Sequence, residues 1–138
     1  MLKNQRRKIT PIKKTSRGSW IRKADKLFSE YIRIRDKYTC QRCHTKHSVK
    51  SMGFHNSHFF GRRMFSVRWD EQNCDALCHG CHRFWEKEDR ESYRAFKVRQ
   101  LGENDFKALD LRAHTVNKKT DPRLVCLTLE ELKKHHGH

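Results

Sequence analysis

The sequence predicts an α+β fold in which a small zinc-stabilised core of short strands is flanked by helices. The first observation is a pair of Cys-x-x-Cys motifs, at residues 40–43 and 78–81, on either side of an intervening segment. The second is weak apolar alternation bounded by glycines within that segment, which is typical of short strands. The third is the three-and-four spacing of apolar residues outside the motifs, which is typical of amphipathic helices. A chain of 138 residues suits one domain with a modest core.

Four cysteines are the candidate ligands of a structural Zn²⁺ ion: Cys40, Cys43, Cys78 and Cys81. Each two-residue gap lets both sulfurs of a pair reach one ion, and four thiolates complete a tetrahedral site. The two pairs are further apart than the roughly 15–20 residues of a plain zinc module, so zinc would clamp the ends of an inserted segment. Disulfides or a redox motif would use similar spacing, but a basic chain without a secretory signal favours zinc. Cys74 and Cys126 are assigned no chemistry.

Charge and hydropathy limit the class of partner. Lys and Arg number 32 against 16 Asp and Glu, which gives a net charge of +16 and makes nucleic acid the leading candidate. Hydrophobic residues make up only 35%, so the core should be thin and zinc would supply much of the folding free energy. We find no apolar run long enough to cross a membrane and no signal peptide, and therefore expect a soluble intracellular protein without a membrane partner.

The first 18 residues contain seven Lys and Arg and no acidic residue. This composition predicts a disordered basic arm at 1–18 that gains order on a phosphate backbone, followed by the folded domain at 19–138. A solubilising tail is the alternative. The arm residues that we assign to DNA contact are Lys13, Lys14 and Arg17.

The remaining elements are predicted from local patterns. Ser19 is expected to cap a first helix that runs to about Lys37. Residues 49–60 are expected to form the short strands of a hairpin, and residues 65–69 a further strand or an extended connection.

The second half of the chain is predicted to be helical. A helix is expected from about His79 to Gln100 and to end at Gly102, and Asn104 is expected to cap a shorter helix. The capping box at 128–131 predicts that a last short helix starts there.

Histidines between and within the cysteine motifs suggest hydrolysis of a phosphodiester. A histidine at the end of a hairpin and another at the start of the next helix are the outline of a ββα-metal nuclease site. His58 would be the general base, since neutral imidazole titrates near neutral pH. His82 would bind a divalent metal ion that neutralises charge on the scissile phosphate. Successive helical residues point about 100° apart, so Cys81 can face zinc while His82 faces the cleft. Asn73 would brace the strand that carries His58.

Basic residues follow the proposed base directly. Arg62 and Arg63 would grip the non-bridging phosphate oxygens, and Arg68 is assigned to the same DNA-binding surface.

These motifs resemble those of a known family. Ser57-His58, Asn73 and the run from Leu77 to His82 resemble HNH endonucleases with zinc-binding cysteine pairs. Over roughly residues 20 to 135 the chain resembles, more narrowly, the phage NinG (Rap) recombination proteins, at 23–36, 57–62, 68–70 and 101–114.

The resemblance implies a phage-encoded DNA endonuclease that acts in recombination on branched DNA such as Holliday junctions. It implies an HNH-type ββα-metal core, a catalytic Mg²⁺ or Mn²⁺ ion, and action in the cytoplasm of a bacterial host. A two-fold junction would suit a homodimer, although no self-complementary apolar face is evident.

Ser57 is a departure from the family pattern. Many HNH enzymes carry Asp, Glu or His there as a second metal ligand. His55, Asp70 or water would replace it, and we favour His55. A bulge would then be needed, because strand parity puts positions 55 and 58 on opposite faces.

Two other functions stay open. One is an HNH endonuclease that nicks or cuts ordinary duplex DNA in packaging or restriction. The other is a non-catalytic zinc-stabilised DNA-binding protein, which Ser57 favours and the spacing of His58, Asn73 and His82 disfavours.

Overall fold

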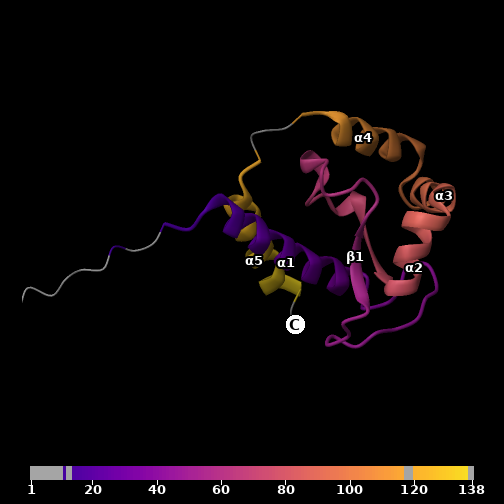
Figure 1. Ribbon diagram of the computed structural model, residues 1–138, viewed down its shortest axis with the longest axis horizontal. Coiled ribbons are helices and arrows are strands. Elements are labelled where there is room, and N and C mark those ends of the chain that lie inside the picture. The colour runs from indigo at the N-terminus through magenta and orange to yellow at the C-terminus, as the bar shows by residue number, and fades with distance from the viewer. Residues whose placement is uncertain (1–10, 12–13, 117–119, 137–138) are drawn as a thin grey trace, which may run out of the picture.

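The computed structural model describes residue 11, residues 14–116 and residues 120–136. Helices surround one two-stranded sheet, and the predicted α+β class is confirmed (Figure 1). Among the described residues, every helix is too short or too polar to cross a lipid bilayer.

Helix α1 runs from Arg17 to Arg35. The predicted cap at Ser19 is wrong, because the Ser16 hydroxyl accepts a hydrogen bond from the Ser19 N–H group at 3.2 Å and the first turn begins earlier. Residues 17 and 18 therefore belong to the helix. At its other end, Lys37 and Tyr38 both have positive φ angles, of 53° and 52°, which a right-handed helix does not allow.

The sheet pairs β1 (Phe54–His58) with β2 (Cys74–Cys78) in antiparallel register, from Phe54 opposite Cys78 to His58 opposite Cys74. The hairpin predicted within residues 49–60 is wrong, because β1 finds its partner further along the chain. Val49 and Met52, which belong to the predicted hairpin, are 72% and 94% exposed and do not belong to the core. By contrast, most of β2 is buried.

Residues 59–73 connect the two strands and contain two short 3₁₀ helices, η1 (Phe65–Val67) and η2 (Glu71–Asn73). Helix η1 replaces the strand or extended connection that was predicted there. Buried Asn73 ties this connection to the end of β1: its side-chain amide donates to the Phe60 carbonyl at 2.9 Å, and its Oδ1 accepts from the Phe60 N–H group at 2.8 Å.

Helix α2 (His79–Arg83) follows β2 directly and continues into a π-helical turn, η3 (Phe84–Glu88), before α3 (Arg90–Leu101) begins. The single helix predicted for this region is therefore interrupted. The break falls at Asp89, whose φ and ψ angles of −141° and 72° are not helical, and whose carboxylate caps α3 by accepting from the Ser92 N–H group at 3.0 Å.

Two further helices complete the fold, α4 (Glu103–His114) and α5 (Pro122–His136). Gly102 joins α3 to α4 with a φ angle of 83°, which favours glycine, and Asn104 lies inside α4 instead of capping it. Helix α5 begins before Thr128, so the predicted capping box lies within the helix. Proline at its first position needs no partner for an N–H group.

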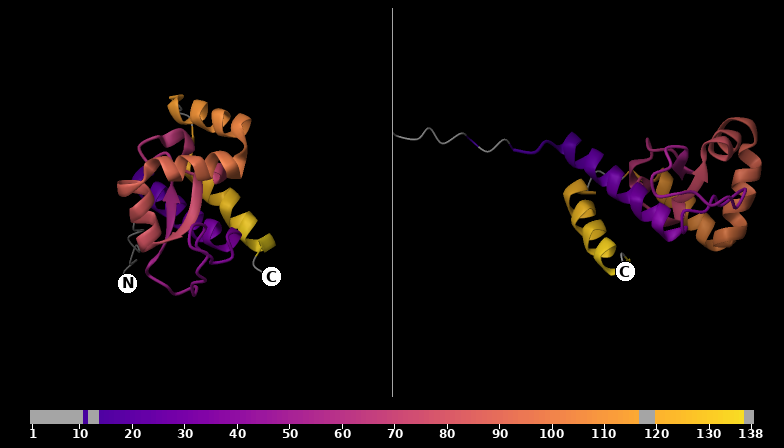
Figure 2. Two further views of the ribbon diagram at one scale, coloured as in Figure 1. Left: turned by 90° about the vertical axis from the view of Figure 1, so that its right-hand side faces the viewer. Right: turned by 90° about the horizontal axis from the view of Figure 1, so that it is seen from below.

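Helix α1 packs against α5 and against both strands, while α3 and α4 lie on the far side of the sheet region (Figures 1 and 2). The core between them is rich in aromatic rings. Tyr93 of α3 stacks on Trp85 at 4.6 Å between ring centroids, and Phe59 meets Tyr93 edge to face at 5.0 Å. Aromatic side chains bury a large area each, which compensates for the low hydrophobic content.

A buried ionic network joins β2 to α3. The Lys97 ammonium lies 3.0 Å from the Asp75 carboxylate, and both side chains are fully buried. Gln100 closes the network by donating to Asp75 at 2.7 Å and accepting from Lys97 at 2.7 Å. One turn earlier on α3, the Tyr93 hydroxyl lies 3.0 Å from the Ser57 hydroxyl of β1.

Candidate metal centre and candidate active site

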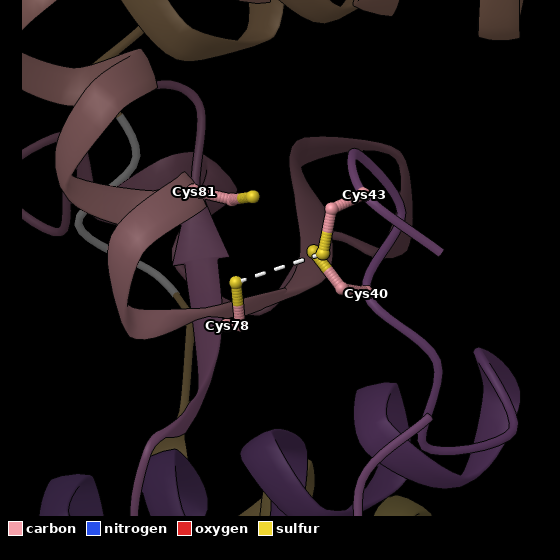
Figure 3. A group of neighbouring side chains, drawn as sticks. All are labelled: Cys40, Cys43, Cys78 and Cys81. Carbon is pink, nitrogen blue, oxygen red and sulfur yellow. Dashed lines mark hydrogen bonds between the residues drawn. The ribbon is translucent and has the colours of Figure 1, made fainter. Parts of the chain in front are cut away.

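Four cysteine sulfurs converge between the turn after α1 and the start of α2 (Figure 3). These residues, Cys40, Cys43, Cys78 and Cys81, form the cysteine cluster. Their sulfur atoms lie within 4.8 Å of one another, and 3.8 Å separates the sulfurs of Cys43 and Cys78. Zn–S bonds of about 2.3 Å in a tetrahedron put neighbouring sulfurs about 3.8 Å apart. The cluster therefore fits one structural zinc ion, and the predicted ligands do come together.

The surroundings of the cysteine cluster shift the thiol pKa values in opposite directions. Arg42 donates a hydrogen bond to the Cys81 sulfur at 3.3 Å, and its guanidinium lies 4.1 Å from the centre of the Phe84 ring. Hydrogen bonds with Thr45 lower the pKa of Cys43 to about 6, whereas burial raises the pKa of Cys81 to about 12. A divalent cation would remove the thiol protons and balance the charge of four sulfurs.

A separate hollow, with a volume of about 570 Å³, lies along the open edge of β1 between α1 and α2. We name it the histidine cleft, because three of its lining residues are His55, His58 and His82. His55 and His58 reach it from opposite faces of β1. No bulge is needed, since the register of β1 is uninterrupted and the cleft lies where β1 has no further described strand beside it.

His55 and His82 point nitrogen atoms at each other across the cleft. Their Nδ1 atoms are 3.1 Å apart. Metal–nitrogen bonds of about 2.0–2.1 Å put two neighbouring ligands on the order of 3 Å apart, so this spacing suits two ligands of one cation. Burial lowers the pKa of His55, and charge on His82 lowers it further, which favours the neutral form that binds metals.

Glu86 orients His82. Its carboxylate Oε1 lies 2.9 Å from His82 Nε2, one helical turn along. A carboxylate that accepts from Nε2–H leaves Nδ1 as the nitrogen with a free lone pair, which is the usual support of a metal-binding histidine. Sequence reasoning missed Glu86, although its i+4 spacing from His82 was a usable signal.

His58 is held on the other side of the cleft. Its Nε2 atom lies 2.9 Å from the Arg68 carbonyl oxygen, which can only accept a hydrogen bond. Nε2 therefore carries the proton and Nδ1 is the basic nitrogen. Burial lowers the pKa of His58, so its imidazole is neutral near pH 7 and able to take up a proton.

Asp25 of α1 fixes the segment that supplies this carbonyl. Its carboxylate accepts from Arg68 at 2.8 and 2.5 Å and from the Trp69 indole at 3.0 Å. Although burial opposes ionisation, the hydrogen bonds and charge of Arg68 hold the pKa of Asp25 below its usual value. This network was not predicted, because 43 residues separate Asp25 from Arg68 along the chain. Arg68 has a positioning role here, and its contact with DNA stays a prediction.

Ser57 and Asp70 lie outside the cleft lining. Ser57 is buried, and its hydroxyl is hydrogen-bonded to the Tyr93 hydroxyl of α3. The Asp70 carboxylate accepts from Arg112 at 2.9 Å and caps η2. Of the alternatives considered for the second metal ligand, the geometry favours His55.

The remaining predicted DNA contacts are basic residues at the surface. Exposed Arg62 lines the histidine cleft and lies 4.0 Å from Asp25, and Arg63 is exposed beside it. Lys14 and Arg17 are exposed near the start of α1. Lys13 lies outside the described residues, as does most of the predicted arm.

A family model described as Bacteriophage Lambda NinG protein matches residues 2–136, nearly the whole chain. Comparisons with curated proteins and with solved structures give no match.

Proposed function

The chain belongs to the bacteriophage lambda NinG family, and from this premise we propose that it is a metal-dependent DNA endonuclease of phage recombination. The histidine cleft would be its active site, in an HNH-type ββα-metal core formed by β1, β2 and α2. The cysteine cluster would hold a structural zinc ion. A partly basic surface and a net charge of +16 suit DNA as the substrate.

One observation carries the proposal: a single cleft has a basic imidazole on one side and a pair of converging imidazoles on the other. The free Nδ1 of His58 would take a proton from a water molecule as the water oxygen attacks the phosphorus atom. The new P–O bond forms as the bond to the leaving oxygen breaks, and Arg62 would contact the non-bridging oxygens.

His55 and His82 would hold the catalytic metal ion, which supplies positive charge beside the phosphate. Mg²⁺ or Mn²⁺ is the expected ion. Two nitrogen ligands suit Mn²⁺ better than Mg²⁺, which is bound mainly through oxygen. Asn73 would act from a distance, by holding the chain after β1 against the return to β2.

Branched DNA is the proposed substrate. Phosphate contacts position a protein but carry no sequence information, and the basic residues of this chain are spread over several elements. Selectivity would then come from DNA shape, and a junction presents bends and widened grooves without the cost of bending an intact duplex.

The test is incubation of pure protein with Mg²⁺ or Mn²⁺ and a four-way junction, a flap, a linear duplex or a plasmid. We expect the junction to be cut faster than a duplex of equal length at one salt concentration. Equal rates on junction and duplex would favour the duplex-cutting alternative. Tight binding without cleavage of any substrate would favour the non-catalytic alternative.

A further inference from the structure

A second hollow opens beside the histidine cleft, with a volume of about 430 Å³. We name it the flanking hollow. Its walls come from Arg17 at the start of α1, from residues 63–66 and from residues 113–116 at the end of α4. Arg62 lines the histidine cleft, and the next residue, Arg63, lines the flanking hollow. The two hollows therefore lie side by side.

Cations and an aromatic ring meet in the flanking hollow. The guanidinium of Arg17 lies 5.5 Å from the centre of the half-buried Phe65 ring. Trp69 packs edge-on against Phe65 at 5.1 Å and fixes the orientation of that ring. Arg63 is exposed, and His114, which pairs with Asp110 at 3.0 Å, forms part of the far wall. None of the described lining residues is acidic.

This combination recognises a nucleotide, because arginine binds phosphate and flat aromatic or guanidinium groups stack on bases. We propose that the flanking hollow binds one unpaired nucleotide of the strand whose scissile phosphate lies in the histidine cleft. The proposal rests on the proposed function and names its substrate more closely.

The bound nucleotide must be unpaired, because a base inside a duplex has no free face for Phe65. Extruding a base from an intact duplex costs free energy, whereas a base that is already unstacked costs less. Flaps and other branched DNAs with a single-stranded segment supply such bases. The flanking hollow would therefore make DNA with an unpaired nucleotide the preferred substrate.

The first experiment uses 2-aminopurine as a single unpaired nucleotide in an otherwise duplex oligonucleotide, placed at a series of positions. The full-length His58→Ala protein binds it, so that cleavage does not interfere. We expect quenching of the fluorescence at one position, caused by stacking on the aromatic side chain. Adding Phe65→Leu, which keeps an apolar side chain but removes the ring, should abolish the quenching and weaken binding of the bulged DNA between about fivefold and a hundredfold.

Matched variants separate the two contacts. Leu111→Ala removes an exposed apolar residue of α4 outside the flanking hollow and should change neither quenching nor affinity. Arg63→Ala should weaken binding of bulged DNA and flatten its salt dependence by about one phosphate contact. Thermal melting checks that each variant is folded. Unchanged quenching and unchanged affinity in a folded Phe65→Leu protein would overturn the proposal.

Initial cleavage rates distinguish this failure from a failure of the proposed function. If the unmodified chain cuts DNA and Phe65→Leu keeps the same preference for bulged over intact duplex, the flanking hollow is refuted and the endonuclease stands. If the chain cuts no DNA with any metal but Phe65→Leu loses the unpaired nucleotide, the flanking hollow stands and the endonuclease is refuted.

Discussion

The cysteine cluster and the histidine cleft are neighbours that share helix α2 and differ in completeness. Cys81 belongs to the first and His82, the next residue, to the second. The cluster offers four sulfur ligands, which leave a tetrahedral ion no further position. The cleft offers two converging nitrogen atoms, and its volume of about 570 Å³ leaves room for water and phosphate. A filled coordination sphere holds a fold together, and an unfilled one is available for chemistry.

Removing a cluster ligand should have the largest effect. Cys40→Ser and Cys78→Ser should lose the zinc and with it a cooperative thermal transition, because structural zinc contributes on the order of 10 kcal/mol of folding free energy. Elemental analysis and melting curves measure both. Cys126→Ala, a buried cysteine far from the cluster in sequence, should keep about one zinc per chain. A zinc-free Cys40→Ser protein with a full cooperative transition would refute the assignment.

Removing the base should affect the cleft alone. We expect His58→Ala to slow cleavage between about a hundredfold and ten-thousandfold, since it removes the group that we propose as the proton acceptor. Zinc content and DNA affinity should stay near those of the unmodified chain. His135→Ala, an exposed histidine of α5, is the control. Normal cleavage by His58→Ala would assign the base to another residue.

Glu86→Gln should weaken metal binding in the histidine cleft without disturbing the cysteine cluster. Loss of the carboxylate that holds His82 should lower the affinity for the catalytic metal about tenfold to a hundredfold, while saturating metal restores most of the rate. Titration of the cleavage rate with Mn²⁺ measures this change. Glu88→Gln, which changes another exposed carboxylate of η3, should titrate like the unmodified chain. Identical Mn²⁺ curves for the two variants would remove Glu86 from the site.

Deleting residues 1–14 should weaken DNA binding without touching either site. The deletion removes six Lys and Arg and keeps Ser16, which caps α1. Each phosphate contact that is lost should reduce the slope of log affinity against log salt by about 0.9, equally on all DNAs. Turnover at saturating DNA should persist. An unchanged salt slope would make these residues a solubilising tail.

The smallest expected effect is a displaced pH profile. Burial lowers the pKa of His58, and only neutral imidazole can accept a proton, so cleavage should be lost as pH falls through that lowered pKa. The acidic limb should therefore lie below the ordinary histidine value of about 6.5. Single-turnover rates between about pH 5 and pH 8, with zinc content checked at each pH, give the profile. A limb above 6.5 would contradict the burial of the base.

Local signals in the sequence were sufficient for one of these two regions. The cysteine cluster was predicted because each pair is close in sequence and sulfur chemistry allows few alternatives. The pairing of the strands was not, since β1 joins a segment beyond a long connection and Phe54 to Gly61 reads equally well as half of a local hairpin. Contacts between residues that are distant in sequence, such as Asp25 and Arg68, produce no periodic pattern from which they could be predicted.

The strand β2 and the break before α3, which the sequence did not predict, both contain an acidic residue. Asp75 and Lys97 are polar in the sequence and yet fully buried, because each satisfies the other. Position 75 therefore interrupts an otherwise apolar strand. In the same way, the helix predicted from His79 onward ignored Asp89, which ends one helical segment and caps the next.

The polar contacts of α3 also decide how the two strands are aligned. Ser57 and Asp75 are opposite each other in the sheet, and Tyr93 and Lys97, one turn apart, meet them. A slip of β2 by one residue would turn Asp75 to the other face and leave Lys97 buried without its partner. Such a loss costs about 3–5 kcal/mol, so this misaligned pairing is strongly disfavoured relative to the native one. Contacts with helix α3 therefore help to fix the register of the two strands. The register in turn determines the positions of His55 and His58 along β1.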